Sequence, residues 1–190
     1  MKSSLNFQCG CGQVKASLSP AGVAAGSRIQ CYCKDCQTSA RHLGYDLPAH
    51  GGTELIQTTP DAISIISGAE NLVIQRLSPK GLCRWYAKCC NTPMFNTLPR
   101  KTLPFAGIVV HPAESEATGQ AMGPIWGHAF TASAPAGGGA PKEDKQMMRI
   151  GAKVVVRMIS AYLSGRAAQN PFLTDDKEWI APVTVLTLEQ

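Results

Sequence analysis

The sequence predicts a mainly β protein with an α-helical extension towards its C-terminus. The chain contains 18 Gly and 13 Pro among its 190 residues, which favours frequent turns and therefore short strands. Apolar runs in the first 111 residues are short and are bounded by such turn residues. Residues 143–164 differ, because their apolar side chains recur every three to four positions, as in a helix that faces a core.

The expected strands are rich in Ile, Leu, Val and aromatic residues, and some alternate apolar with polar positions. In chain order they are residues 5–7, 14–18, 27–30, 53–57, 62–67, 71–77, 83–87, 94–97 and 105–111. Gly, Pro and Asn place turns between them at residues 20–26, 51–52, 79–81 and 89–93. A short helical turn is expected over residues 37–43.

The last third of the chain changes character. Residues 132–141 (ASAPAGGGAP) read as a flexible connection. In the helix expected over 143–164, Glu143 and Asp144 suit the first turn and Gly165 suits the C-terminal cap. Residues 183–186 are expected to add an edge strand. These boundaries predict a β domain over 1–131, a flexible loop over 132–141, and a helix and tail over 142–190 that pack on the same domain.

Two stripes run along the expected helix. The apolar stripe, which we expect to pack, consists of Met147, Ile150, Val154, Met158 and Tyr162. The basic stripe consists of Lys145, Arg149, Lys153 and Arg157. It either meets an anionic partner or forms a solvated face opposite the packed one.

Charge and hydropathy exclude several classes of protein. The net charge is +5, but the basic residues are scattered, which argues against nucleic-acid binding. No apolar run approaches the length of a membrane span, and the N-terminal residues lack the apolar core of a secretory signal. We therefore expect a cytoplasmic protein without a membrane partner, which is either a monomer or a homodimer.

All eight cysteines lie within the first 90 residues, as close pairs and a triplet. In a chain without an export signal, such clusters favour metal binding over disulfides. A zinc ion takes four ligands in a tetrahedron, and tight turns deliver thiolates well. Cys9 and Cys11 form one such turn, and Cys89 and Cys90 form the comparable turn downstream. We expect these four thiolates to hold a closed, structural zinc.

Cys31, Cys33 and Cys36 form a different cluster, because one loop can bring all three thiolates to one metal. Three protein ligands with an open fourth position are typical of catalytic zinc. Alternatively, a remote Cys83, His42 or His128 closes the site. An iron–sulfur cluster is a weaker alternative, since such clusters usually take four Cys at other spacings. We expect two Zn²⁺ ions per chain.

These motifs resemble those of the glutathione-dependent formaldehyde-activating enzymes, a family that includes centromere protein V. That family carries Cys-x-Cys-Gly, then Cys-x-Cys-x-x-Cys, then Phe-Cys-x-x-Cys-Gly-Thr. Residues 9–12 and 31–36 match the first two motifs, and residues 86–92 keep part of the third. Ala87 replaces a cysteine there and Asn91 replaces the glycine, so the chain looks like a divergent bacterial-type member with Cys89 as a substitute ligand. The resemblance covers roughly residues 5–111.

The resemblance implies an Mss4-like β fold, a structural zinc on the outer motifs and a second zinc on the middle motif. It also implies a carbon–sulfur lyase activity, in which a glutathione-like thiol adds to formaldehyde or leaves its adduct. Cys31, Cys33 and Cys36 would then be ligands of the catalytic zinc. The alternative is a zinc-stabilised binding or scaffold module without catalysis.

Several further side chains have two possible roles. Asp35 is either a base beside the metal or a solvated loop residue. Trp85, Tyr86 and Cys83 are expected in the core rather than in the site. Four basic residues could hold substrate carboxylates or be ordinary surface charges: Arg28, Lys34, Arg41 and Arg84.

Overall fold

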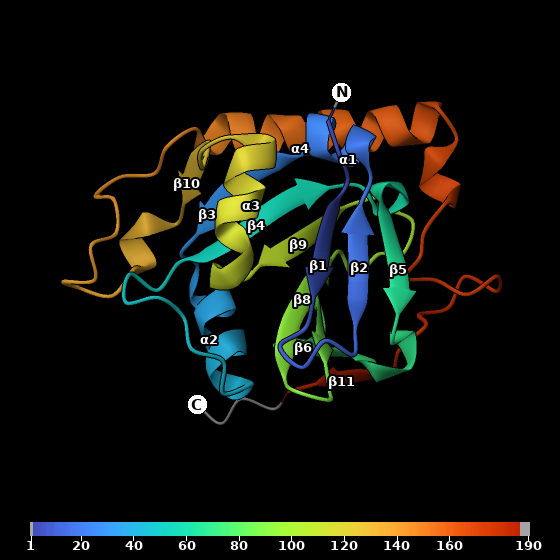
Figure 1. The fold of residues 1–190 in the computed structure, drawn as a ribbon, viewed down its shortest axis with the longest axis horizontal. Helices are drawn as coiled ribbons and strands as arrows, with labels where there is room; N and C mark the ends of the chain where they lie inside the picture. Colours follow the sequence, from blue (N-terminus) through green and yellow to red (C-terminus); the bar gives the residue numbers. More distant parts are fainter. Residues whose placement is uncertain (1, 187–190) are drawn as a thin grey trace.

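The computed structural model describes residues 2–186, and its fold is mainly β, with two sheets and a few helices (Figure 1). The strands are β1 (Leu5–Gln8), β2 (Lys15–Leu18), β3 (Ser27–Cys31), β4 (Thr53–Thr58), β5 (Ile63–Ser67), β6 (Leu72–Arg76), β7 (Cys83–Ala87), β8 (Thr92–Thr97), β9 (Ala106–Val110), β10 (Gly127–Ala129) and β11 (Val183–Val185). The α-helices are α1 (Pro20–Ala25), α2 (Lys34–His42), α3 (Pro112–Met122) and α4 (Met147–Leu163). Within residues 2–186, no helix has the length and apolarity needed to cross a membrane.

The larger sheet has eight strands in the order β10-β3-β4-β9-β8-β7-β6-β11. Its neighbours are antiparallel except at the two edges, where β10 runs parallel to β3 and β11 runs parallel to β6. The edge strand expected near the C-terminus is therefore present as β11. The smaller sheet has the order β1-β2-β5 and is antiparallel throughout.

The main core fills the space between the two sheets. In Figure 1 the small sheet lies in front of the large one, and Phe7 and Leu18 of the small sheet share a buried cluster with Ile56 and Trp85 of the large sheet. Phe172, from the tail after α4, packs against Trp85 with ring centroids 4.8 Å apart and the ring planes tilted by 45°. Trp85 is thus a core residue, as expected.

The opposite face of the large sheet carries a second, smaller core. Because side chains alternate along a strand, Leu55 of β4 belongs to this second core while its neighbour Ile56 belongs to the first. Ile150 of α4 and Cys36 of α2 complete the second core. The two helices and the three-cysteine cluster therefore share one face of the sheet.

Two helices, α1 and α3, lie where the sequence predicts no helix. Residues 20–26, expected as a turn, contain α1, in which Ser19 accepts a hydrogen bond from the Gly22 N–H and Pro20 occupies the first turn. The sequence predicts no helix over the residues of α3 either. Its sequence, PAESEATGQAM, carries no apolar stripe, so the periodicity on which the prediction depends is missing. Pro112 at its start was the available signal.

Helix α4 begins at Met147, four residues later than expected. Asp144 is therefore outside the helix, where it accepts hydrogen bonds from the Thr131 N–H and hydroxyl. The expected apolar stripe is packed only in part, since Ile150 is buried whereas Met147 and Tyr162 are exposed. The basic stripe is not wholly solvated either. Arg157 donates to the carbonyl of Ala25 and the hydroxyl of Ser27, at 3.0 and 2.8 Å.

Candidate metal centres

The first cluster joins two turns that lie 80 residues apart in the sequence. Cys9 and Cys11 follow β1, and Cys89 and Cys90 follow β7. Their four sulfur atoms lie within 4.8 Å of one another. Cys89 and Cys90 lie in a tight turn, in which the Cys90 N–H donates to the Ala87 carbonyl at 3.2 Å, so two adjacent cysteines can face one point. The structure thus brings together the four cysteines that the sequence predicts as ligands of one metal.

The sulfur spacings in this cluster suit a tetrahedral metal site. A tetrahedron with zinc–sulfur bonds of about 2.3 Å has edges of about 3.8 Å. The Sγ–Sγ distances are 3.5 Å for Cys9–Cys11, 3.3 Å for Cys11–Cys89, 3.8 Å for Cys9–Cys89 and 3.9 Å for Cys89–Cys90. A set of four thiolates at these distances could hold a divalent soft metal without any further ligand.

Nearby donors stabilise negative charge on these sulfurs. The Val14 N–H donates to Cys9 Sγ at 3.3 Å, and the Thr92 hydroxyl lies 3.0 Å from Cys90 Sγ. Partial burial opposes ionisation of Cys90, but the hydrogen bonds from Thr92 and from Cys11 outweigh it and lower the pKa of Cys90 to about 6. Burial and the neighbouring thiols raise the pKa of Cys89 instead. Thiolates are the form in which cysteine binds metals, so the donors to Cys9 and Cys90 favour binding at these two sulfurs.

The second cluster lies where β3 ends and α2 begins. Cys31 is the last residue of β3, Cys33 is the N-cap of α2, and Cys36 lies in the first turn of that helix. The three sulfurs are within 4.8 Å of one another, with Cys31 and Cys36 4.0 Å apart. The Cys36 N–H donates to Cys33 Sγ at 3.4 Å. The N-terminal end of a helix also favours nearby negative charge.

No fourth protein ligand joins this second cluster among residues 2–186. Cys83 is fully buried in the core between the two sheets, and His128 instead has Nδ1 3.5 Å from the Tyr32 hydroxyl. His42, at the far end of α2, does not belong to the group either. The three-cysteine cluster therefore offers a metal three thiolates and leaves its remaining position to another molecule.

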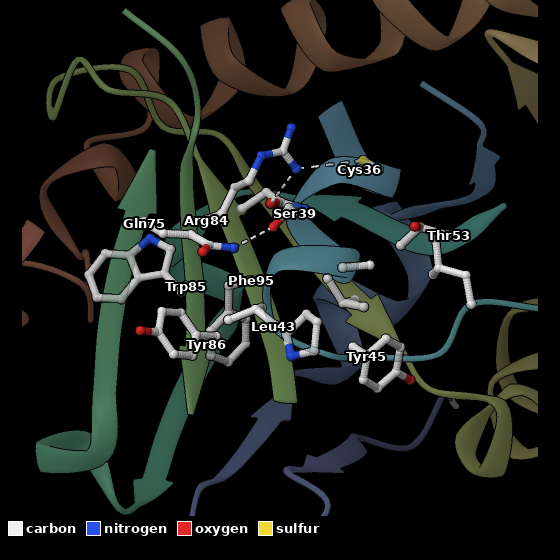
Figure 2. A pocket seen from close by; sticks show the side chains of 15 residues that line it. Cys36, Ser39, Leu43, Tyr45, Thr53, Gln75, Arg84, Trp85, Tyr86 and Phe95 are labelled. Carbon is white, nitrogen blue, oxygen red and sulfur yellow. Dashed lines mark hydrogen bonds between the residues drawn. The ribbon is translucent and has the colours of Figure 1, made fainter. Parts of the chain in front are cut away.

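Arg84 of β7 places a positive charge against this cluster. Its guanidinium is almost fully buried and lies 3.6 Å from Cys36 Sγ, with Asn96 and Asp35 at 3.5 and 3.6 Å (Figure 2 shows it directed at Cys36). Hydrogen bonds from Cys31 and Cys33 hold the pKa of Cys36 well below its ordinary value, and Arg84 lowers it further. A buried guanidinium with only these long contacts is suited to balance a negatively charged metal–thiolate centre.

Two hollows adjoin the three-cysteine cluster. The crevice beneath α2 in Figure 2 has a volume of only about 30 Å³, and Gln75 crosses it to donate to the Ser39 hydroxyl at 2.6 Å. A larger cavity of about 730 Å³ lies between α4 and the sheet and includes all three cysteines in its wall. Only the larger one can admit a substrate-sized molecule.

The other candidate residues lie in different settings. Arg28 is buried and donates to Glu54 at 2.6 Å, so it is not free to bind a substrate. Lys34 and Asp35 are exposed in the wall of the larger cavity, whereas Arg41 is exposed and contacts Thr38. Tyr86 is half-buried and lines the crevice beneath α2, so it is not a full core residue.

Sequence reasoning missed most of the cavity wall. The order of the strands places Asn96 and Gly107 in the same cavity wall as the cysteines, and the path of the chain after β10 adds Phe130. No local pattern marks these three residues. The apolar stripe of the expected helix includes Met147, Ile150 and Val154, but it predicts packing and not a cavity wall.

Comparisons with known proteins identify the family of this chain but assign no activity to it. A solved structure of a Rhodobacter sphaeroides protein, a structural-genomics target, is similar at 19% sequence identity and a TM-score of 0.40. The match covers 58% of this chain and 94% of that one. No curated protein matches the chain. The model of DUF6151, a family of unknown function, matches residues 1–182. Because that match spans nearly the whole sequence, the chain belongs to the DUF6151 family.

Proposed function

We propose that the three-cysteine cluster holds a zinc ion with an exchangeable fourth ligand, and that the protein is a zinc-dependent carbon–sulfur lyase-type enzyme. Its reaction would resemble that of S-(hydroxymethyl)glutathione synthase. The observation that carries this proposal is the convergence of Cys31, Cys33 and Cys36 beside a cavity, without a fourth ligand among the described residues. A zinc ion there would bind the sulfur of a thiol and favour its thiolate form near neutral pH.

The proposed reaction joins a thiol and a small aldehyde. The thiol sulfur forms a bond to the carbonyl carbon, the π electron pair moves to the carbonyl oxygen, and that oxygen takes up the proton that the thiol gives up. The product is a hemithioacetal, which for formaldehyde is the S-hydroxymethyl thiol adduct, and the reverse reaction returns thiol and aldehyde. No oxidant or reductant is required.

Arg84 would act here as a positioning residue. Three cysteine thiolates and one Zn²⁺ carry a net charge of −1, which the guanidinium at 3.6 Å from Cys36 Sγ offsets. A substrate thiolate would make the centre more negative, and Arg84 would then stabilise the bound form. Asp35 is 66% exposed and 3.6 Å from Arg84, so we assign it to orienting that side chain rather than to proton transfer.

The four-cysteine cluster would hold a second, structural zinc that fastens the turn after β1 to the turn after β7. The relationship to the formaldehyde-activating family and an Mss4-like fold form part of the same proposal. The order of the three cysteine motifs and the mainly β fold support them. A cytoplasmic location and a monomeric or homodimeric state remain predictions.

Exchange NMR tests the activity. With hexane-1-thiol or glutathione and formaldehyde, the zinc-loaded protein should increase the rate of adduct formation and breakdown above that in buffer. Cys33→Ser should remove the increase, because it removes a zinc ligand. A rate equal to that in buffer for both thiols would refute the proposed reaction on formaldehyde.

A scaffold without catalysis is the second candidate, and one observation favours it. The outer side of α4 exposes large apolar side chains at helical spacing, including Met148 (89% exposed) and Leu163 (86% exposed). Such a face suits a protein partner. Metal exchange separates the two candidates. Rapid replacement of the three-cysteine zinc by Cd²⁺ indicates an open site, whereas a metal that does not exchange indicates a scaffold.

A further inference from the structure

The larger cavity, which adjoins the three-cysteine cluster, gives information on the substrate, and this inference rests on the proposed function. At about 730 Å³, the cavity is within the usual range for small-molecule sites, roughly 300–1,000 Å³. Most of its wall is apolar. Its apolar side chains include Leu82, Leu98, Phe105, Phe130, Met147 and Ile150.

Two glycines leave this space open from opposite sides. Gly107 is in the floor, on the same sheet face as Asn96 directly across from it, and a Cβ there would meet its nearest neighbours at 3.8 Å. Gly151 is an exposed residue of α4 in the roof, and a Cβ there would meet nothing within 4 Å. Glycine destabilises a helix interior relative to alanine, and neither packing nor backbone conformation requires it at position 151. Because Gly151 has no side chain, it leaves room in the cavity.

Phe130 adds a strained, exposed aromatic ring to the same wall. Its backbone is left-handed (φ 61°, ψ 36°), a conformation that a bulky residue rarely adopts. Its side chain is 48% exposed, although large apolar groups are normally covered. Strain of this kind persists where the surrounding structure holds it, and it is concentrated at binding sites.

Charged groups are confined to the cysteine end of the cavity. Among the described residues of its wall, the charged ones are Lys34, Asp35 and Arg84. Arg84 contacts Asp35 and Cys36, and Lys34 is exposed at the same end, so the wall beyond the cysteines offers no charged partner for an ionic group. Glutathione would bring two carboxylates and an ammonium group into this space, and burying unpaired charges is costly.

We propose that the substrate of the three-cysteine site is a thiol, or thiol–aldehyde adduct, whose sulfur is attached to an apolar alkyl or aryl body. The sulfur lies at the cysteines beside Arg84, and the apolar body fills the cavity between the floor at Gly107 and the roof at Gly151. Glutathione is then a poor ligand of this site.

Isothermal titration calorimetry tests this on the zinc-loaded full chain, independently of any activity. Hexane-1-thiol should bind at least about tenfold more tightly than glutathione, because its chain is removed from water. Gly151→Phe should weaken hexane-1-thiol binding at least about tenfold by filling the cavity, and Gly151→Leu should weaken it less. Ala152→Phe, at the neighbouring exposed position of the same helix, is the matched control and should bind as the wild type does.

Equal affinity for the two thiols, or an unchanged affinity in Gly151→Phe, would overturn the assignment of the cavity. Thermal unfolding and zinc content of each variant show whether a loss of binding reflects a filled cavity. If Gly151→Phe unfolds, the Gly151→Leu result decides. Failure of the proposed function has a different signature: thiol–formaldehyde exchange would not accelerate, while the calorimetric preference for hexane-1-thiol would remain.

Discussion

The two cysteine clusters both present sulfur atoms, but they differ in how far apart their cysteines lie in the sequence and in whether they leave a position for a further ligand. The four-cysteine cluster would take its ligands from turns 80 residues apart, with Cys11 exposed to solvent and four thiolates that leave no position for a further ligand. The three-cysteine cluster would take its ligands from six consecutive residues, offers three thiolates among the described residues and borders a cavity. A metal that joins distant segments holds the fold together, whereas a metal bound by one loop beside a cavity is available for chemistry.

The largest expected effect comes from removing one ligand of each centre in turn. Cys11→Ser should unfold or aggregate the chain, because structural zinc in small domains contributes about 10–16 kcal/mol of apparent binding energy and total stability is only about 5–15 kcal/mol. Cys11 is exposed, so the new hydroxyl itself should cost little. Denaturant unfolding and zinc content measure the outcome.

Cys33→Ser is the matched variant. Cys33 caps α2, and serine is a favoured N-cap residue, so the helix should remain. We expect a folded protein with one zinc fewer. If Cys11→Ser and Cys33→Ser lose the fold equally, the division into a structural and an open centre is wrong.

A smaller effect should follow from Arg84→Gln. Removal of the charge 3.6 Å from Cys36 Sγ should lower the zinc affinity of the three-cysteine centre by about 10–100-fold, and leave the four-cysteine centre unchanged. Competition with a chromophoric chelator would resolve the two affinities. Arg41→Gln, an exposed arginine on α2, is the control. Equal weakening of both centres in Arg84→Gln would indicate a general loss of stability instead.

The sequence predicts the cysteine clusters better than it predicts their surroundings. Close spacing of Cys31, Cys33 and Cys36 leaves the chain little freedom, so local sequence suffices to place them together. The pairing of Cys9 with Cys89 follows from two similar turns, and the packing of the small sheet on the large one brings these turns into contact. The position of Arg84 could not be inferred, because it depends on how β7 and α2 share one sheet face.

The secondary structure shows the same limit. Strands with strong apolar runs lie close to their expected positions, whereas α3 lacks an apolar stripe and was missed. Residues 143–146 suit a helix by composition, but the contact of Asp144 with Thr131 keeps them outside α4. The start of α4 therefore depends on a tertiary contact, which the local sequence of residues 143–146 does not reveal.

Cys83→Ala should have a modest effect on stability and tests whether Cys83 is a ligand of the three-cysteine cluster. Cys83 is fully buried in the core, so we expect a loss of about 1 kcal/mol of stability from the small cavity. The zinc content should stay at two per chain, as measured by atomic emission on protein purified without chelators. A fall to one zinc would make Cys83 a ligand and would remove the open position from the second centre.

The smallest expected effect concerns pH. Burial lowers the pKa of His111 below its ordinary value of 6.5, so the unfolded chain takes up this proton at a higher pH than the folded chain does. The stability of the wild type should therefore fall as the pH drops from 6.5 towards the lowered pKa, by less than about 1 kcal/mol. Above about pH 7 the effect is absent.

His111→Gln removes the imidazole that titrates. Comparison of this variant with the wild type separates the contribution of His111 to the pH dependence from that of the cysteine thiolates. Denaturant unfolding between pH 5.5 and 7.5, with zinc content checked at each pH, should give a flatter profile for the variant. A wild-type profile with the same slope as that of His111→Gln would mean that the thiolates account for all of the acid sensitivity.

Anomalous diffraction at the zinc absorption edge, on crystals of chelator-free protein, tests the central claim most directly. We predict two zinc peaks per chain. One should be bound by Cys9, Cys11, Cys89 and Cys90, and the other by Cys31, Cys33 and Cys36 with a non-protein atom as the fourth ligand. A single peak at the four-cysteine cluster, or a protein side chain as fourth ligand of the second metal, would contradict the account.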